Sequence, residues 1–126
     1  NFYANGSVSF TGNVSTTGSL NLTKYAETVY GMGSVSGTIT PDLNNGSIQS
    51  MTLTGNITLN SLSNVVAGSS ATLKISQNGT GGYTLSSTMK FASGFKTLST
   101  SAYATDIISV FYDGSDYYAT LTTGYA

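Results

Sequence analysis

The sequence predicts an all-β fold, and three observations lead to that prediction. β-Branched and aromatic residues recur in short runs with polar residues between them, which is the period-2 alternation of half-buried strands. Gly, Asn and Asp gather between these runs, where turns need residues that tolerate positive φ. No segment carries the apolar spacing of an amphipathic helix over three turns. We expect an antiparallel, jelly-roll-like β-sandwich.

The strands are expected at short intervals along the chain. Ala71–Gln77 shows the alternation best. Its residues Ala71, Leu73 and Ile75 share one face, while polar residues occupy the other. Asp106–Tyr112 has almost no polar break, so we expect it to be the central strand of the core. The remaining predicted strands are Ser7–Phe10, Ser19–Thr23, Thr28–Tyr30, Val35–Thr40, Ile48–Leu59, Tyr83–Ser86, Met89–Phe91 and Tyr117–Thr123.

The clearest turn lies between the last two predicted strands, at Asp113-Gly114-Ser115-Asp116. Aspartate is favoured in such a turn because its side chain accepts hydrogen bonds from neighbouring backbone amides. We therefore interpret Asp113 and Asp116 as turn residues rather than as paired catalytic acids or calcium ligands.

The first part of the chain differs from the rest. Gly6, Gly12 and Gly18 recur every six residues, and isolated apolar residues stand among Ser and Thr. This is too little apolar surface for a core made by one chain, but three chains wound together could bury it. We expect a fibrous, intertwined β segment over residues 1–33 and a β-sandwich module over residues 34–126. The residues expected at the subunit interface are Val8, Phe10, Val14, Leu20 and Leu22.

The composition argues against several classes of function. Charged residues make up 7% of the chain, against roughly 25% in ordinary soluble domains, which suggests a surface buried in an assembly or solubilised by hydroxyl and amide groups. The four lysines are scattered and the net charge is −1, so we expect no nucleic-acid partner. The chain has no His and no Cys, and we expect no enzyme activity, no metal and no cofactor. No apolar run reaches the length of a membrane span, and we expect no membrane insertion.

Tyrosine is abundant, with nine copies and no tryptophan. Its ring and hydroxyl suit sugar faces and protein interfaces, although strands also use tyrosine in cores and subunit contacts. Alternation should turn one residue of the adjacent pair Tyr117 and Tyr118 inward and the other outward. The candidates for ligand binding are Tyr83, Tyr103 and Tyr117.

One resemblance covers most of the chain, from Leu22 to Ala126. It is carried, in order, by the segments Asn21–Tyr30, Gly37–Asp42, Thr52–Leu59, Ser87–Leu98, Asp106–Gly114 and Tyr117–Ala119. In these segments the chain resembles the C-terminal β-rich module of bacteriophage tail-fibre and other virion structural proteins, notably those of marine phages. The resemblance implies a non-enzymatic virion protein with a β-sandwich module, usually trimeric where it is attached to a fibre.

We therefore expect a homotrimeric distal module of a tail fibre on the virion exterior, assembled in the host cytoplasm and involved in attachment to the host surface. Its expected partners are other copies of itself, other virion proteins and host-surface glycans, which three weak sites could bind through avidity. Two alternatives stay open. A capsid decoration protein would bind emptied heads rather than cells, and a strand-exchanged subunit of a cell-surface filament would form open polymers.

Overall fold

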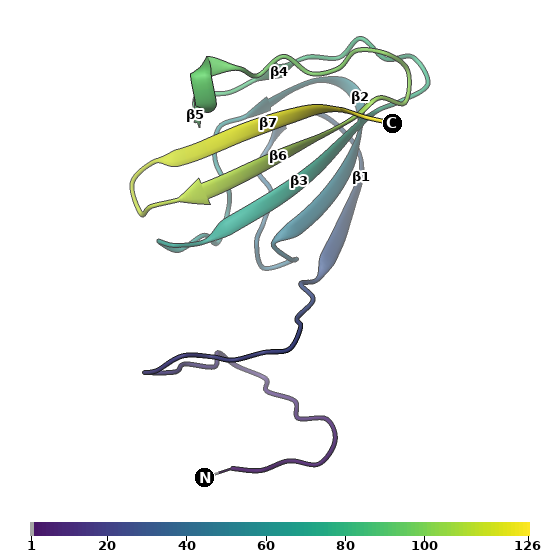
Figure 1. The fold of residues 1–126 in the computed structure, drawn as a ribbon. Helices are drawn as coiled ribbons and strands as arrows, with labels where there is room; N and C mark the ends of the chain where they lie inside the picture. The colour runs from purple at the N-terminus through teal and green to yellow at the C-terminus, as the bar shows by residue number, and fades with distance from the viewer. Residues whose placement is uncertain (1) are drawn as a thin grey trace.

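The computed structural model describes residues 2–126 and confirms that the fold is all-β (Figure 1). One 3₁₀ turn, η1 (Ala92–Gly94), is the only helical element in the described part of the chain. The strands form one mixed sheet in the order β1-β2-β3-β6-β7-β5, and β4 pairs separately with β2. Their bounds are β1 (Val29–Ile39), β2 (Ile48–Leu59), β3 (Ser70–Gln77), β4 (Leu85–Ser86), β5 (Lys90–Phe91), β6 (Thr105–Tyr112) and β7 (Tyr117–Tyr125).

The single mixed sheet corrects the expected antiparallel sandwich. β1, β2 and β3 run parallel to one another, whereas β3, β6 and β7 are antiparallel. The return segments 40–47 and 60–69 stack as well, because Asp42 forms a parallel bridge with Ser63. The first half of the sheet is therefore built like successive coils of a β-solenoid. Alternation in a sequence identifies the faces of a strand but not its direction, so it does not distinguish the two arrangements.

Two glycines coincide with interruptions in the regular pairing of β1 with β2. Gly33 and Gly37 have φ of 74° and 71°, which glycine adopts without steric cost, and the register with β2 shifts near both. The return segments 40–47 and 60–69 are shorter than the crossover of about a dozen residues or more that usually joins parallel strands. The coil closes tightly at Gly46, where a Cβ would lie 2.6 Å from the carbonyl oxygen of Thr28.

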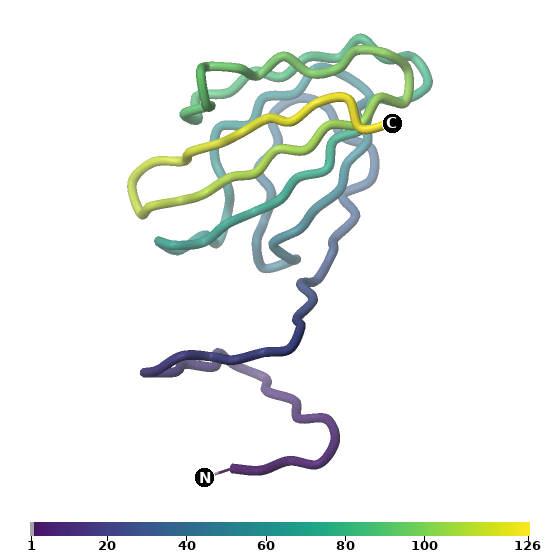
Figure 2. Tube along the Cα trace, in the orientation of Figure 1, coloured from purple at the N-terminus to yellow at the C-terminus, as the bar shows by residue number. Residues whose placement is uncertain are grey.

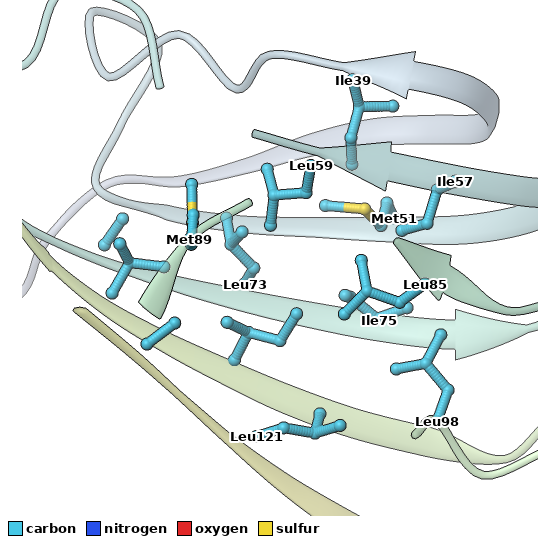
Figure 3. Packing of buried hydrophobic residues seen from close by; sticks show 14 of the residues in the cluster. Ile39, Met51, Ile57, Leu59, Leu73, Ile75, Leu85, Met89, Leu98 and Leu121 are labelled. Atoms are coloured by element: carbon cyan, nitrogen blue, oxygen red, sulfur yellow. The ribbon is translucent and has the colours of Figure 1, made fainter. Parts of the chain in front are cut away.

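The sheet curls around its hydrophobic core, and the segment that carries β4 and β5 bridges its two sides. β4 pairs with β2, and β5 pairs with β7. Figure 3 shows the core side chains of these strands meeting inside the curl. Leu53, Leu73 and Ile108 are fully buried, and each such burial stabilises the fold by about 1.5–3 kcal/mol. The prediction that Ala71, Leu73 and Ile75 face the core is confirmed.

Two buried polar side chains hold the long segment between β3 and β6 against the sheet. Gln77 Nε2 donates to the carbonyl oxygens of Tyr83 (2.8 Å) and Ser99 (2.9 Å), and its Oε1 accepts from the Tyr83 N–H (3.1 Å). Asp106 accepts from the N–H (2.7 Å) and the hydroxyl (2.8 Å) of Ser99. It also accepts from the N–H of Gly124 (3.0 Å). A long irregular segment lacks a regular ladder, so these side chains supply the partners that its backbone needs.

Residues 2–28 form an extended arm that stands away from the sheet (Figure 2). All of these residues are exposed, and within the described chain none of them forms a strand. The strands predicted at Ser7–Phe10 and Ser19–Thr23 are therefore not formed in the single chain. The reason is physical, because a strand persists only when a neighbouring strand satisfies its backbone N–H and C=O groups.

The arm meets the sheet at the beginning of β1. β1 begins at Val29, so the boundary predicted between residues 33 and 34 falls inside this strand. The predicted segment also included Asn1, which lies outside the described residues. The coil that contains β1 thus belongs to the folded sheet, and the arm leads directly into it.

Candidate functional surface

The described chain offers surfaces rather than cavities for binding. Residues 2–126 enclose no pocket. In the same part of the chain, no three His, Cys, Asp or Glu side chains form a group that could hold a metal ion. A search of these residues also finds no helix with the length and apolar character of a membrane span. Large aromatic side chains are exposed on the outer face of the sheet, and the candidate site lies there.

Four side chains on neighbouring strands form a line across this face, which we call the aromatic row. It consists of Ser70 on β3, Phe111 on β6, Tyr118 on β7 and Lys90 on β5. Phe111 pairs with Ser70 on one side and with Tyr118 on the other. Tyr118 in turn pairs with Lys90. Directly opposed residues lie on the same face of a sheet, and strands are about 4.8 Å apart, so the row is roughly 14 Å long.

Alternation along β6 and β7 turns the row outward. Val110 and Ala119, the neighbours of the two aromatic residues, are 2% and 3% exposed. Phe111 and Tyr118 themselves are 46% and 43% exposed. Directly opposed aromatic residues stabilise a strand pair by roughly 0.2–1 kcal/mol, yet here they leave much of each ring uncovered. The result is a pair of exposed rings on a regular, paired backbone.

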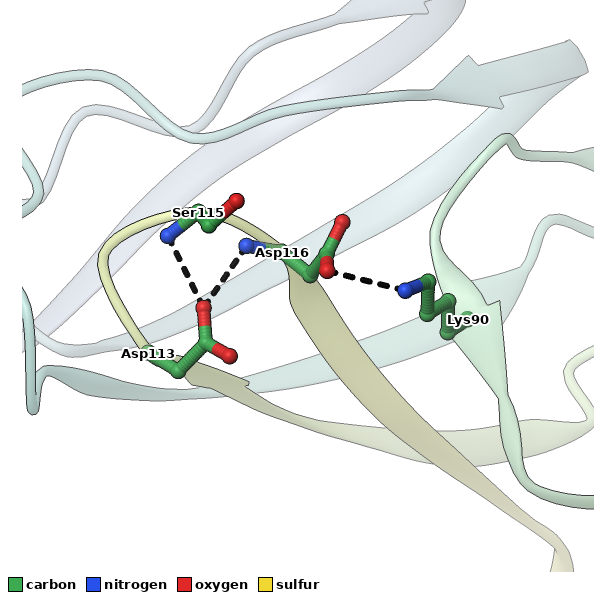
Figure 4. Close-up of polar contacts among 4 residues, drawn as sticks. All are labelled: Lys90, Asp113, Ser115 and Asp116. Carbon is green, nitrogen blue, oxygen red and sulfur yellow. Dashed lines mark hydrogen bonds and ion pairs between the residues drawn. The ribbon is translucent and has the colours of Figure 1, made fainter.

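An ion pair fixes one end of the row. Lys90 Nζ lies 2.8 Å from Asp116 Oδ2 (Figure 4) and 5.4 Å from the centroid of the Tyr118 ring. The hydrogen bond from Lys90 to Asp116, together with the charge of that carboxylate, raises the pKa of Lys90. Both side chains are well exposed, so the pair contributes little to stability. Its effect is to hold the ammonium group beside the aromatic ring.

The turn between β6 and β7 positions Asp116. Asp113 Oδ1 accepts hydrogen bonds from the backbone N–H groups of Ser115 (2.8 Å) and Asp116 (2.7 Å), as Figure 4 shows. These bonds favour the ionised carboxylate and hold the pKa of Asp113 below its ordinary value. The predicted hairpin is confirmed, with Asp113 bonded to the backbone of its own turn.

The three tyrosines predicted to bind ligand lie in different environments. Tyr83 is partly buried and packs against the core. Tyr117 is also partly buried, and its hydroxyl oxygen lies 3.3 Å from both the backbone nitrogen and the carbonyl oxygen of Leu62. Tyr103 is 76% exposed, with its hydroxyl close to Gly79. The structure does not gather these tyrosines on one exposed surface, and their role in binding stays a prediction.

Part of the aromatic row could have been found in the sequence, although none of its members was predicted as a site. The hairpin register pairs Phe111 with Tyr118, and the buried neighbours of both place them on the outer face. Ser70 and Lys90 come from strands distant in sequence. Period-2 alternation does not reveal which distant strands become neighbours, so the sequence did not indicate that these two residues lie in the row.

The arm residues predicted to lie at a subunit interface are all exposed. Their exposed fractions lie between 45% for Val8 and 66% for Phe10. The others are Val14, Leu20 and Leu22. Within residues 2–126 these side chains do not pack against the core of their own chain, so they are accessible to another chain. Whether they form an interface stays a prediction.

A comparison with protein families identifies the chain. A family model described as "Putative phage tail fibre C-terminal domain" matches residues 39–117, more than half of the chain. The chain belongs to this family. The matched part of this tail-fibre domain runs from the end of β1 to the start of β7 and includes Lys90, Phe111 and Asp116. A search of curated proteins and a search of solved structures each give no match.

Membership confirms the resemblance to phage tail-fibre modules. The protein is a structural component of a phage tail fibre and so part of the virion. The family is a structural one. The aromatic row and the exposed arm are therefore surfaces of a fibre component.

Proposed function

We propose that this tail-fibre domain is the distal, host-attaching module of a homotrimeric fibre and that it binds host-surface glycans through the aromatic row. The observation that carries the proposal is the row itself. Two exposed rings, Phe111 and Tyr118, stand side by side between the ammonium group of Lys90 and the hydroxyl of Ser70. Sugar rings present apolar C–H faces that pack on aromatic rings, and hydroxyls that bond to such polar groups.

A second line of side chains beside the row adds hydroxyl groups. Ser109 on β6 pairs with Thr72 on β3 and with Thr120 on β7, and all three alternate with buried residues. A sugar chain lying along the row would meet donors and acceptors on this side. The charge of Lys90 is compensated by Asp116, so the surface favours an uncharged glycan over a strongly anionic one.

The first prediction concerns the double variant Phe111→Ala/Tyr118→Ala. Each ring contributes about 0.5–1.5 kcal/mol of stacking, so losing both removes about 1–3 kcal/mol and should weaken binding by a factor of about 5 to 150. The measurement is the binding of labelled protein to cells of the bacterium that the phage infects, with and without excess polysaccharide from those cells. The matched control is Phe95→Ala, which removes a ring that is 46% exposed, like Phe111, but lies outside the row, and this variant should bind like the wild type.

Two results would contradict this proposal. If the double variant binds cells as well as the wild type does, the row is not the attachment site. If wild-type binding persists in excess polysaccharide, the receptor is not that glycan. Binding to emptied capsids rather than to cells would support the alternative of a capsid decoration protein, which the family match makes less favoured.

The surface area of the chain supports the trimer. The chain exposes 8102 Å², whereas a compact monomer of 13.0 kDa exposes about 6,300 Å². The surplus of about 1,800 Å² is roughly twice the 800 Å² or so that each partner contributes to a standard protein–protein interface, as contact with two neighbours in a trimer would require. The arm contributes to this surplus, because it exposes large apolar side chains that a neighbouring copy would bury. Three copies would also present three aromatic rows, so that weak individual sites add up through effective concentration.

The second prediction concerns molar mass. Light scattering on the purified chain should give three times the chain mass of 13.0 kDa. The value should hold over a range of protein concentrations, because a closed trimer does not grow. A stable monomer would contradict the trimer, and polymers that lengthen with concentration would instead support the strand-exchanged filament.

A further inference from the structure

β1 presents a free edge in the described chain. It is the first strand in the order of the sheet and pairs only with β2 there. Its sequence, VYGMGSVSGTI, contains no proline and no charged residue. Natural proteins usually block an exposed edge with lysine, proline or a covering segment, because unpaired N–H and C=O groups recruit another strand. β1 has bulges, but it lacks the other safeguards.

The coil that contains β1 is also the open end of the parallel stack. Met32 and Val35 pack against the core but remain only partly buried, and Val29 is 65% exposed. Stacked coils bury their apolar interior against neighbours, and the last coil needs a cap. Within residues 2–126, nothing caps β1.

The same chain contains segments that are suited to pair with this edge. Val8 and Phe10 alternate with serines in the first predicted strand, and Leu20 and Leu22 alternate with polar residues in the second. Residues 2–23 contain no charge and no proline. Yet among the described residues these segments remain unpaired. The molecule thus has an unpaired strand edge and unpaired strand-forming segments at the same end (Figure 2).

We infer that the free edge of β1 is an intersubunit site and that the arm of a second copy fills it as an added strand. The inference rests on the proposed trimer and names the surfaces that form it. An added strand supplies main-chain hydrogen bonds, while Val8, Phe10, Leu20 and Leu22 cover the open end of the stack. The contact joins two different surfaces, arm and edge, so it is head-to-tail, and three such contacts close into a ring when the rotation between copies allows.

The arm of the second copy is favoured over the chain's own arm. The arm leaves the sheet at the beginning of β1 and extends away from it rather than folding back along it (Figure 1). Within the described residues it makes no backbone hydrogen bond with the sheet. Its own β1 is therefore left open.

Introduced cysteines test this inference directly, because the chain has none of its own. Ser34→Cys on β1 is combined with Ser9→Cys or with Asn21→Cys in the arm, all at exposed positions. Under mild oxidation, at least one pair should give mainly covalent dimers and trimers on a denaturing gel. The matched control replaces the β1 cysteine by Ser115→Cys, in the exposed β6–β7 turn, and keeps the same arm cysteines. It should give at least tenfold less cross-linking.

The outcomes separate this inference from the proposed function. In a further experiment, two chains of different length are refolded together, one with the β1 cysteine and the other with an arm cysteine. A cross-link between these two chains would establish that the arm comes from a second copy. Cross-links only within one chain would overturn that assignment in favour of the chain's own arm. A trimer by light scattering with no cross-linking above the control would overturn the β1 site alone, whereas a monomer would overturn the proposed trimer as well.

A charge on the edge gives an independent readout. Lysine on an edge strand opposes the addition of another strand, so Ser34→Lys should raise the concentration at which the trimer dissociates by at least about tenfold. Ser115→Lys adds the same charge away from the edge and should leave the trimer unchanged. Equal dissociation of the two variants would contradict the site.

Discussion

The variant Asp106→Ala should unfold with a free energy about 3 kcal/mol or more below that of the wild type. The carboxylate is 2% exposed and accepts three hydrogen bonds, two from Ser99 and one from the N–H of Gly124. Alanine would leave these donors without a partner, and each unsatisfied buried group costs about 1–3 kcal/mol. The measurement is urea unfolding followed by circular dichroism, at one fixed protein concentration because assembly shifts apparent stability.

Two control variants separate hydrogen bonding from charge. Asp106→Asn keeps one acceptor oxygen, so it should restore part of the lost stability. Asp116→Ala removes an exposed carboxylate from the surface ion pair and should change the unfolding midpoint little. If Asp106→Ala were as stable as the wild type, the long segment before β6 would not depend on the hydrogen bonds of Asp106.

Local patterns predicted most of the strands. β2 matches the predicted segment Ile48–Leu59, and Ala71–Gln77 differs from β3 by one residue. The hairpin at residues 113–116 was also predictable, because Asp and Gly fix that turn through contacts within four residues. In each case the determining interactions are close in sequence or depend only on which side of a strand is apolar.

The pairing of the strands was not predictable in the same way. The short segments between β1, β2 and β3 look like hairpin loops, but they are the return paths of stacked coils. Hydrophobic alternation does not encode the direction of a strand, so it does not decide between these arrangements. An antiparallel sandwich was therefore the natural expectation, and a mixed sheet is what forms.

The buried polar residues were missed for a related reason. Gln49, Gln77 and Asp106 are all nearly inaccessible to solvent, although their side chains are polar. Gln77 and Asp106 are buried because both reach the backbone of the segment around Ser99, which is distant in the sequence from Gln77. Gln49 likewise donates to the carbonyl oxygens of Asp42 and Gly46. Their burial depends on where irregular segments cross the sheet, and that is tertiary information.

The candidate site shows the same division between local and distant information. Phe111 and Tyr118 follow from the hairpin, whereas Lys90 reaches Tyr118 only because β5 adds to the edge of β7. The predicted Tyr117 and the observed Tyr118 are neighbours, and the expected split of this pair into inward and outward residues is confirmed. Sequence alternation therefore established that one tyrosine of the pair is exposed, and the burial of Ala119, the neighbour of Tyr118, shows that this residue is Tyr118.

The variant Leu73→Ala should lower the free energy of unfolding by about 2–5 kcal/mol, the usual cost of removing a large buried aliphatic side chain. Leu73 is fully buried on β3, between β2 and β6, where it pairs with Gln49 and Ile108. Protein cores are close-packed, so the surrounding side chains of the core would fill the cavity only in part. The measurement is the same urea unfolding experiment used for Asp106→Ala.

The matched control for this prediction is Val66→Ala, at a side chain that is 70% exposed, which should change stability by less than about 0.5 kcal/mol. Leu73 faces the core, whereas Phe111 and Tyr118 lie on the outer face, so the folded Leu73→Ala variant should still bind cells. A loss of less than about 1 kcal/mol would mean that the core around Leu73 collapses into the cavity. Loss of cell binding while the variant remains folded would mean that the row depends on core packing beneath it, and the binding effect of the double alanine variant would then need the same structural control.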